Sequence, residues 1–98
     1  MEIKKQQNGT ALMMAVIGRL DTTTAPQLEE AVNASVEGIT ELVFDFEKVE
    51  YISSAGLRVI LMTQKIMNKQ GSLKIVHVSD EVMEVFEITG FSDILTIE

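Results

Sequence analysis

A chain of 98 residues with 46% apolar residues, 23% charged residues and one proline has the composition of a single folded globular domain. It contains no cysteine, which excludes disulfides, thiolate metal sites and cysteine nucleophiles. The net charge of −7 repels phosphate backbones and anionic lipid, so nucleic acid and membrane surfaces are poor candidates for partners. A partner with a basic surface fits this charge better, although acidity can also serve solubility alone.

The N-terminal sequence MEIKKQQNGT lacks the apolar segment of a secretory signal, and the longest apolar runs are too short to cross a bilayer. These features predict a cytoplasmic protein.

The first half of the chain predicts two strands and a helix. A short strand over 2–7 is expected to pair, through a turn at Asn8-Gly9, with a dense apolar strand over 11–20. The following helix is expected to begin at the segment TAPQ. There Thr24 has the character of a capping residue, and Gln27 completes a capping box.

The second half alternates strands and helices. Strands are expected over 41–49, 73–78 and 93–98, and helices over 56–70 and 79–90. The order β-β-α-β-α-β-α-β predicts an α/β fold: one small domain spanning 1–98, with a mixed, partly parallel sheet of about five strands and helices packed against it.

Few residues carry the pattern of an enzyme. His77 is expected inside a strand without a catalytic role, and the carboxylates of Asp21, Asp45 and Glu47 fall near expected strand ends without a companion cluster. No phosphate-binding lysine loop or dinucleotide-binding glycine motif is present. We therefore expect no catalytic residues, no metal and no cofactor.

The segment YISSAGLRVI places Ser53 and Ser54 where a strand leads into a helix. Either hydroxyl can cap the free N–H groups of the first turn, which contributes about 1 kcal/mol. The same position favours a phosphate group, because the helix dipole and the unpaired N–H groups attract negative charge. Gly56 in the first turn is expected to leave room for a partner.

Three segments, in this order, resemble a known family: GRLDTTTAPQLEEAV, FDFEKVEYISSAGLRVIL and ITGFSDIL. They are similar to STAS domains, and specifically to the bacterial anti-sigma factor antagonists, over roughly 8–97. The resemblance implies a STAS-like fold and a protein that binds an anti-sigma factor and so releases a sigma factor.

The resemblance also implies a switch. The implied partners are an anti-sigma factor of the histidine-kinase-like serine kinase type, which phosphorylates Ser54 and so weakens the complex, and a serine phosphatase, which restores binding. The family usually has aspartate immediately before the acceptor. Here that residue is Ser53, which is a possible second acceptor. The residues expected to contact the partner are Asp21, Thr22, Thr23, Thr24, Ser53, Ser54, Ala55, Gly56, Leu57 and Arg58.

The serine at position 53 keeps an alternative open. Without the usual aspartate, the chain could be a STAS-type interaction subunit of a transport or signalling assembly that is not regulated by phosphorylation.

Overall fold

The computed structural model describes all residues from 1 to 98 and shows four strands, three α-helices and a short 3-10 helix. The elements are β1 (Glu2–Asn8), β2 (Ala11–Leu20), α1 (Ala25–Ser35), β3 (Glu41–Ile52), α2 (Ser54–Gln70), β4 (Ser72–Val76), α3 (Asp80–Thr89) and the 3-10 helix η1 (Phe91–Asp93).

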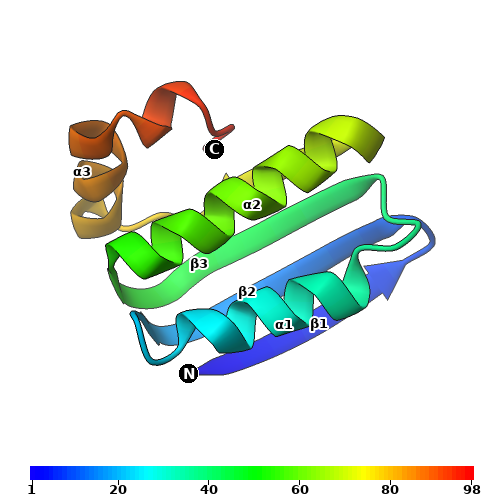
Figure 1. Cartoon of the computed structure of the whole chain (residues 1–98), viewed down its shortest axis with the longest axis horizontal. Coiled ribbons are helices and arrows are strands. Elements are labelled where there is room, and N and C mark those ends of the chain that lie inside the picture. The colour runs from blue at the N-terminus through cyan, green and yellow to red at the C-terminus, as the bar shows by residue number, and fades with distance from the viewer.

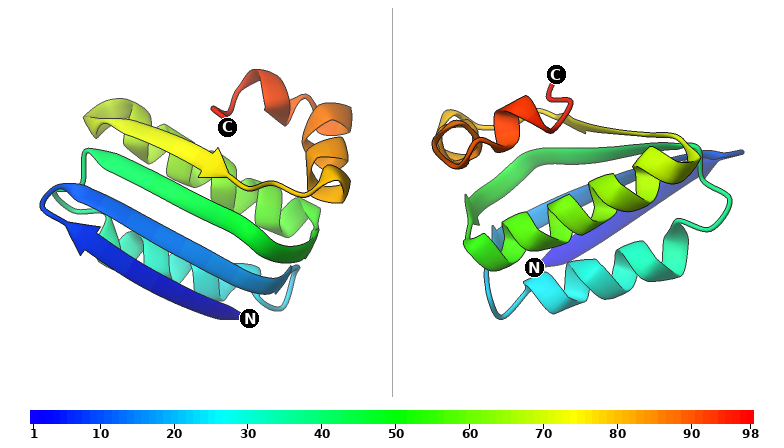
Figure 2. Two further views of the ribbon diagram at one scale, coloured as in Figure 1. Left: turned by 180° about the vertical axis from the view of Figure 1, so that it is seen from behind. Right: turned by 45° about the horizontal axis from the view of Figure 1, so that its top comes forward.

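The strands form one mixed sheet in the order β1-β2-β3-β4. The antiparallel β1–β2 pair closes through Asn8 and Ala11, which confirms the expected hairpin, and Gly9 in its turn has a φ of 65°. β2, β3 and β4 are parallel to one another. The helices α1 and α2 lie side by side on one face of this sheet (Figures 1 and 2), so the α/β expectation is confirmed.

The hydrophobic core lies between the sheet and these two helices. Alternate residues of β2, namely Leu12, Met14 and Val16, are buried, as the period of two in a strand requires. On β3 the rings of Phe44 and Phe46 stack with their centroids 5.7 Å apart. The buried residues facing them from the helices include Leu28, Val32, Ile60 and Met67. None of the helices combines the length and the apolar character needed to span a bilayer.

The expected strand over 93–98 is wrong, and the sheet has four strands. Gly90 takes a left-handed conformation with a φ of 81° that ends α3, and the chain continues into the 3-10 helix. Only Ile97 then reaches β4, where it forms an isolated parallel bridge with Ile75. The segment buries Leu95 but forms no continuous ladder.

Candidate functional site

The two segments with predicted site residues begin at the same edge of the sheet, where β2 and β3 end. Leu20 and Ile52 are register partners in the last rung of this parallel pair. The Ser53 N–H then donates a hydrogen bond of 2.9 Å to the Leu20 carbonyl oxygen. This backbone bond ties the start of α2 to the turn that precedes α1.

Gly56 brings the first turn of α2 against the sheet. A Cβ at this position would lie 2.7 Å from Leu20 Cγ and 3.0 Å from Ile52 Cγ1, too close for any side chain. Gly56 is itself buried. The expectation that it leaves room for a partner is therefore wrong, because the missing side chain makes room for the protein's own strand ends.

Asp21 organises the turn before α1. Its Oδ1 accepts hydrogen bonds from the N–H groups of Thr23 (3.0 Å) and Thr24 (3.1 Å). The Thr24 hydroxyl donates to the Arg19 carbonyl oxygen at 2.7 Å and accepts from the Asp21 N–H at 2.9 Å. Since this hydroxyl is already engaged, Thr24 makes no side-chain cap and the expected capping box does not form. The carboxylate three residues earlier satisfies the turn instead.

These contacts hold the Asp21 carboxylate in its charged form. The hydrogen bond from the Thr24 N–H is the largest cause that lowers the pKa of Asp21. Desolvation opposes it, and the Thr23 N–H, the Thr24 hydroxyl and the Arg19 guanidinium lower the pKa further. Arg19 Nε lies 3.7 Å from Asp21 Oδ2. Asp21 therefore carries a fixed negative charge, which the neighbouring Arg19 guanidinium partly offsets.

We expect Asp21→Asn to change how stability depends on pH. A carboxyl group with a depressed pKa in the folded state stabilises the protein above its ordinary pKa of 3.8, and this contribution is lost as pH falls through the folded-state value. The wild type should therefore exceed the variant in free energy of unfolding at pH 5–7, and the difference should shrink below pH 4. Urea denaturation at pH 7, 5, 4 and 3 measures it.

A matched control is Glu50→Gln, because Glu50 is an exposed carboxylate without a side-chain hydrogen bond or ion pair. This variant should follow the wild-type profile. Parallel profiles for wild type and Asp21→Asn down to pH 3 would contradict the role given to Asp21.

Two residues that sequence reasoning missed also lie at this edge. Arg19 and Tyr51 are register partners on β2 and β3, and the Arg19 guanidinium carbon lies 4.3 Å from the centroid of the Tyr51 ring. Tyr51 is 42% exposed. The available signal was their position, since each stands two residues before a predicted site residue, Asp21 or Ser53.

The serine pair divides into one inward and one outward residue. Ser53 is the residue before the first turn of α2, but its Oγ is buried and has no hydrogen-bond partner. Ser54, the first residue of the helix, is exposed and makes no side-chain hydrogen bond. The expected capping of α2 by one of these hydroxyls is therefore wrong. The Ser54 hydroxyl is open to solvent at the positive end of the helix dipole.

Three of the ten predicted partner-contacting residues, Thr22, Ala55 and Arg58, line a groove of about 220 Å³ between the starts of α1 and α2, which we call the helix-start groove. Gly56 and Leu57 are buried beneath this edge, and Ser54 and Arg58 are exposed on it. Sequence reasoning missed the other four residues of the groove lining, namely Ala25, Pro26, Glu29 and Val59. The groove is lined by Thr22, Ala25, Pro26, Glu29, Ala55, Arg58 and Val59.

A second polar cluster lies elsewhere on the sheet. His77 is not inside a strand: β4 ends at Val76, and His77 follows it with a φ of 58°. Its Nδ1 lies 3.0 Å from Asp45 Oδ1, and a carboxylate oxygen of Glu47 completes a group within 4.8 Å. Asp45 and Glu47 belong to the middle of β3, not to its end as expected. Seven residues of extended strand, about 23 Å, separate Asp45 from Ile52.

The sheet order, the helices on one face and the two helix starts at one edge define a class of protein. A family model described as the STAS domain matches residues 2–98, and the chain belongs to this family. The resemblance found in the sequence is thereby confirmed.

Particular members of the family match over most of the chain. The anti-sigma-B factor antagonist of Bacillus subtilis is 34% identical over 93 residues, which cover 94% of this chain and 85% of that protein. The crystal structure of an anti-sigma factor antagonist from Mycobacterium paratuberculosis has a TM-score of 0.86 at 24% identity, covering 98% of this chain and 83% of that one.

The fold also matches the anti-sigma factor antagonist SpoIIAA in its unphosphorylated form, with a TM-score of 0.77 at 14% identity over 99% of this chain and 87% of that chain. These relatives are regulatory binding proteins and not enzymes, which agrees with the expectation for this chain.

Proposed function

We propose that this protein is an anti-sigma factor antagonist. In this proposal it acts in the cytoplasm and binds an anti-sigma factor through the edge formed by the starts of α1 and α2, which releases a sigma factor. Its binding is switched off by phosphorylation of Ser54. The observation that carries the proposal is the exposed, unpaired Ser54 hydroxyl at the start of α2, at the same edge as the fixed charge of Asp21.

Ser54 fits the role of acceptor better than Ser53. A kinase must bring the γ-phosphate of ATP in line with the hydroxyl oxygen, which then bonds to phosphorus as the bond to ADP breaks and the hydroxyl proton leaves. The exposed Ser54 hydroxyl permits this approach, whereas Ser53 Oγ is buried. The phosphate would add close to two negative charges near Asp21.

The switch needs no change of shape. The Ser53 N–H bond to Leu20 and the close contact of Gly56 with the strand ends fix the start of α2 on the sheet. Phosphate on Ser54 would therefore act directly on the contact surface, by charge and by size. A serine phosphatase would hydrolyse the phosphate ester and restore the surface.

The experiment combines the protein with ATP and the kinase-type anti-sigma factor encoded in the same genome. We expect mass spectrometry to find one phosphate on the wild type and on Ser53→Ala, and none on Ser54→Ala. The unmodified protein should displace sigma factor from its complex with the anti-sigma factor. Phosphate on Ser53, or displacement that persists after complete phosphorylation of Ser54, would contradict the switch.

The alternative of an interaction subunit without phosphorylation rests on Ser53 in place of the usual aspartate. It predicts a different result in the same experiment: no phosphate on either serine and no displacement of sigma factor.

A further inference from the structure

Helix α2 differs in charge from the rest of the molecule. Three of the eight basic residues lie on it, Arg58, Lys65 and Lys69, and none of the fifteen acidic residues does. The helix therefore carries +3, while the remainder of the chain carries −10. The surface of this acidic protein therefore has one positively charged helix, α2.

The three cations lie on the outward side of α2. All are exposed, and their spacing of seven and then four residues keeps them along one side of a helix. They cover about 16 Å of helix axis, or three turns. None of these three cations forms an ion pair. The ion pairs of the structure are Arg19–Asp21, Lys74–Glu98 and His77–Asp45.

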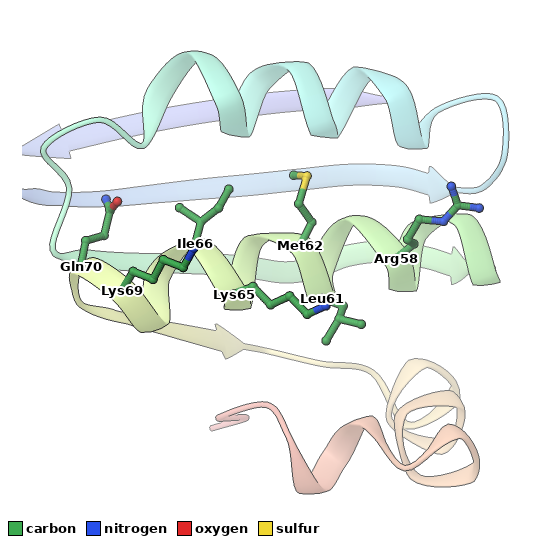
Figure 3. A pocket seen from close by; sticks show the side chains of 7 residues that line it. All are labelled: Arg58, Leu61, Met62, Lys65, Ile66, Lys69 and Gln70. Atoms are coloured by element: carbon green, nitrogen blue, oxygen red, sulfur yellow. The ribbon is translucent and has the colours of Figure 1, made fainter.

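Apolar side chains lie between these cations. Leu61, Met62 and Ile66 are partly buried, and with the cations they line a groove of about 400 Å³, which we call the α2 groove. In Figure 3, Met62 and Ile66 point toward α1, whereas Leu61 points toward the C-terminal segment. Apolar side chains therefore lie on both sides of α2. The lining residues are Arg58, Leu61, Met62, Lys65, Ile66, Lys69 and Gln70.

We propose that the α2 groove binds an acidic amphipathic helix of about three turns. Its apolar face would contact Leu61, Met62 and Ile66, and its carboxylates would pair with the three cations. The charge of +3 on α2 favours an acidic partner, and the charge of −10 on the rest of the chain favours a small one. A large polyanion such as duplex nucleic acid would also meet the acidic surface around α2 and be repelled by it, whereas a short helix would contact α2 alone. The proposal does not depend on phosphorylation of Ser54, although Arg58 also lines the helix-start groove.

The test uses a synthetic 14-residue helical peptide with leucines along one face and glutamates flanking it, titrated into the full-length ¹⁵N-labelled protein. We expect amide shifts confined to α2 and the facing residues of α1. Lys65→Glu combined with Lys69→Glu should weaken binding at least tenfold. The matched control, Lys4→Glu with Lys5→Glu, makes the same change of net charge on the distant strand β1 and should weaken binding by less than threefold.

Two further peptides sharpen the result. A peptide of the same composition with its glutamates placed all around the helix should bind at least tenfold more weakly. A peptide with lysines in place of the glutamates should bind the Lys65→Glu, Lys69→Glu variant more tightly than the wild type. Equal binding of the patterned and scrambled peptides, or shifts outside α2 and the facing residues of α1, would overturn the proposal. So would a concentration-dependent dimer that the α2 variant abolishes, since the occupant would then be a second copy.

Discussion

The variant Ser54→Asp is expected to bind its anti-sigma factor about 100-fold more weakly than the wild type, while its fold remains intact. A buried and unpaired charge at an interface costs about 2–5 kcal/mol, and a 100-fold loss corresponds to about 2.7 kcal/mol. The fold should tolerate the change because Ser54 is exposed in the first turn of α2, where the helix dipole favours a negative charge. Calorimetric titration and thermal denaturation measure the two effects.

The control for this prediction is Ser54→Asn, because the asparagine side chain has nearly the same shape as aspartate but carries no charge. We expect it to keep affinity within about fivefold of the wild type, and its melting temperature should not exceed that of Ser54→Asp. If both variants lose affinity equally, shape and not charge controls binding. If Ser54→Asp binds as the wild type does, this serine lies outside the interface and the proposed switch fails.

The variant Gly71→Ala is expected to be the most damaging small substitution for stability. Gly71 ends α2, and a Cβ at this position would overlap the backbone of Thr40, whose carbonyl oxygen accepts a hydrogen bond from the Ser72 N–H. Backbone atoms cannot give way as a flexible side chain can. We expect a loss of about 3 kcal/mol or more, which for a domain of this size lowers the melting temperature by roughly 12 °C or more.

The matched control is Gly38→Ala. Gly38 has open space around its missing Cβ but a φ of 80°, so alanine there meets backbone strain without a clash and should cost about 1 kcal/mol. Chemical denaturation of both variants separates the two causes. Equal losses for Gly71→Ala and Gly38→Ala would contradict the steric account. The strain of φ does not apply to Gly71, whose φ of 174° is extended.

The sequence predicted the alternation of elements well because local signals agreed with the global fold. The dense apolar run of β2 and the turn at Asn8-Gly9 are signals that lie within a few residues of the elements they predict. At the start of α3, Ser79 acts as a cap, since its Oγ accepts a hydrogen bond of 3.2 Å from the Val82 N–H.

The errors occurred where backbone geometry or a hydrogen-bond partner overrode the pattern of residue types. Residues 93–98 have the apolar pattern of a strand, but a ladder needs a partner of sufficient length, and β4 ends at Val76. Thr24 has the character of a cap, but its hydroxyl oxygen already accepts a hydrogen bond from the Asp21 N–H. His77 lies within the segment LKIVHV, which the sequence predicts to be a strand throughout, yet its backbone leaves the strand conformation there. Each outcome depends on backbone geometry or on a hydrogen-bond partner, neither of which the pattern of apolar residues specifies.

For the candidate site, the sequence identified the segments but not their surroundings. Asp21 and Ser54 were found because they belong to recognisable local patterns. The ring of Tyr51 beneath the Arg19 guanidinium depends on the register of β2 against β3, which shifts twice along the pair. Such shifts leave no clear mark in the sequence.

The bond from the Ser53 N–H to the Leu20 carbonyl oxygen uses only atoms that nearly every amino acid supplies. The position of the neighbouring hydroxyl therefore does not depend on which side chain stands at residue 53. A change of this side chain, from an acid to a serine for example, therefore preserves the backbone bond that holds Ser54 at this edge.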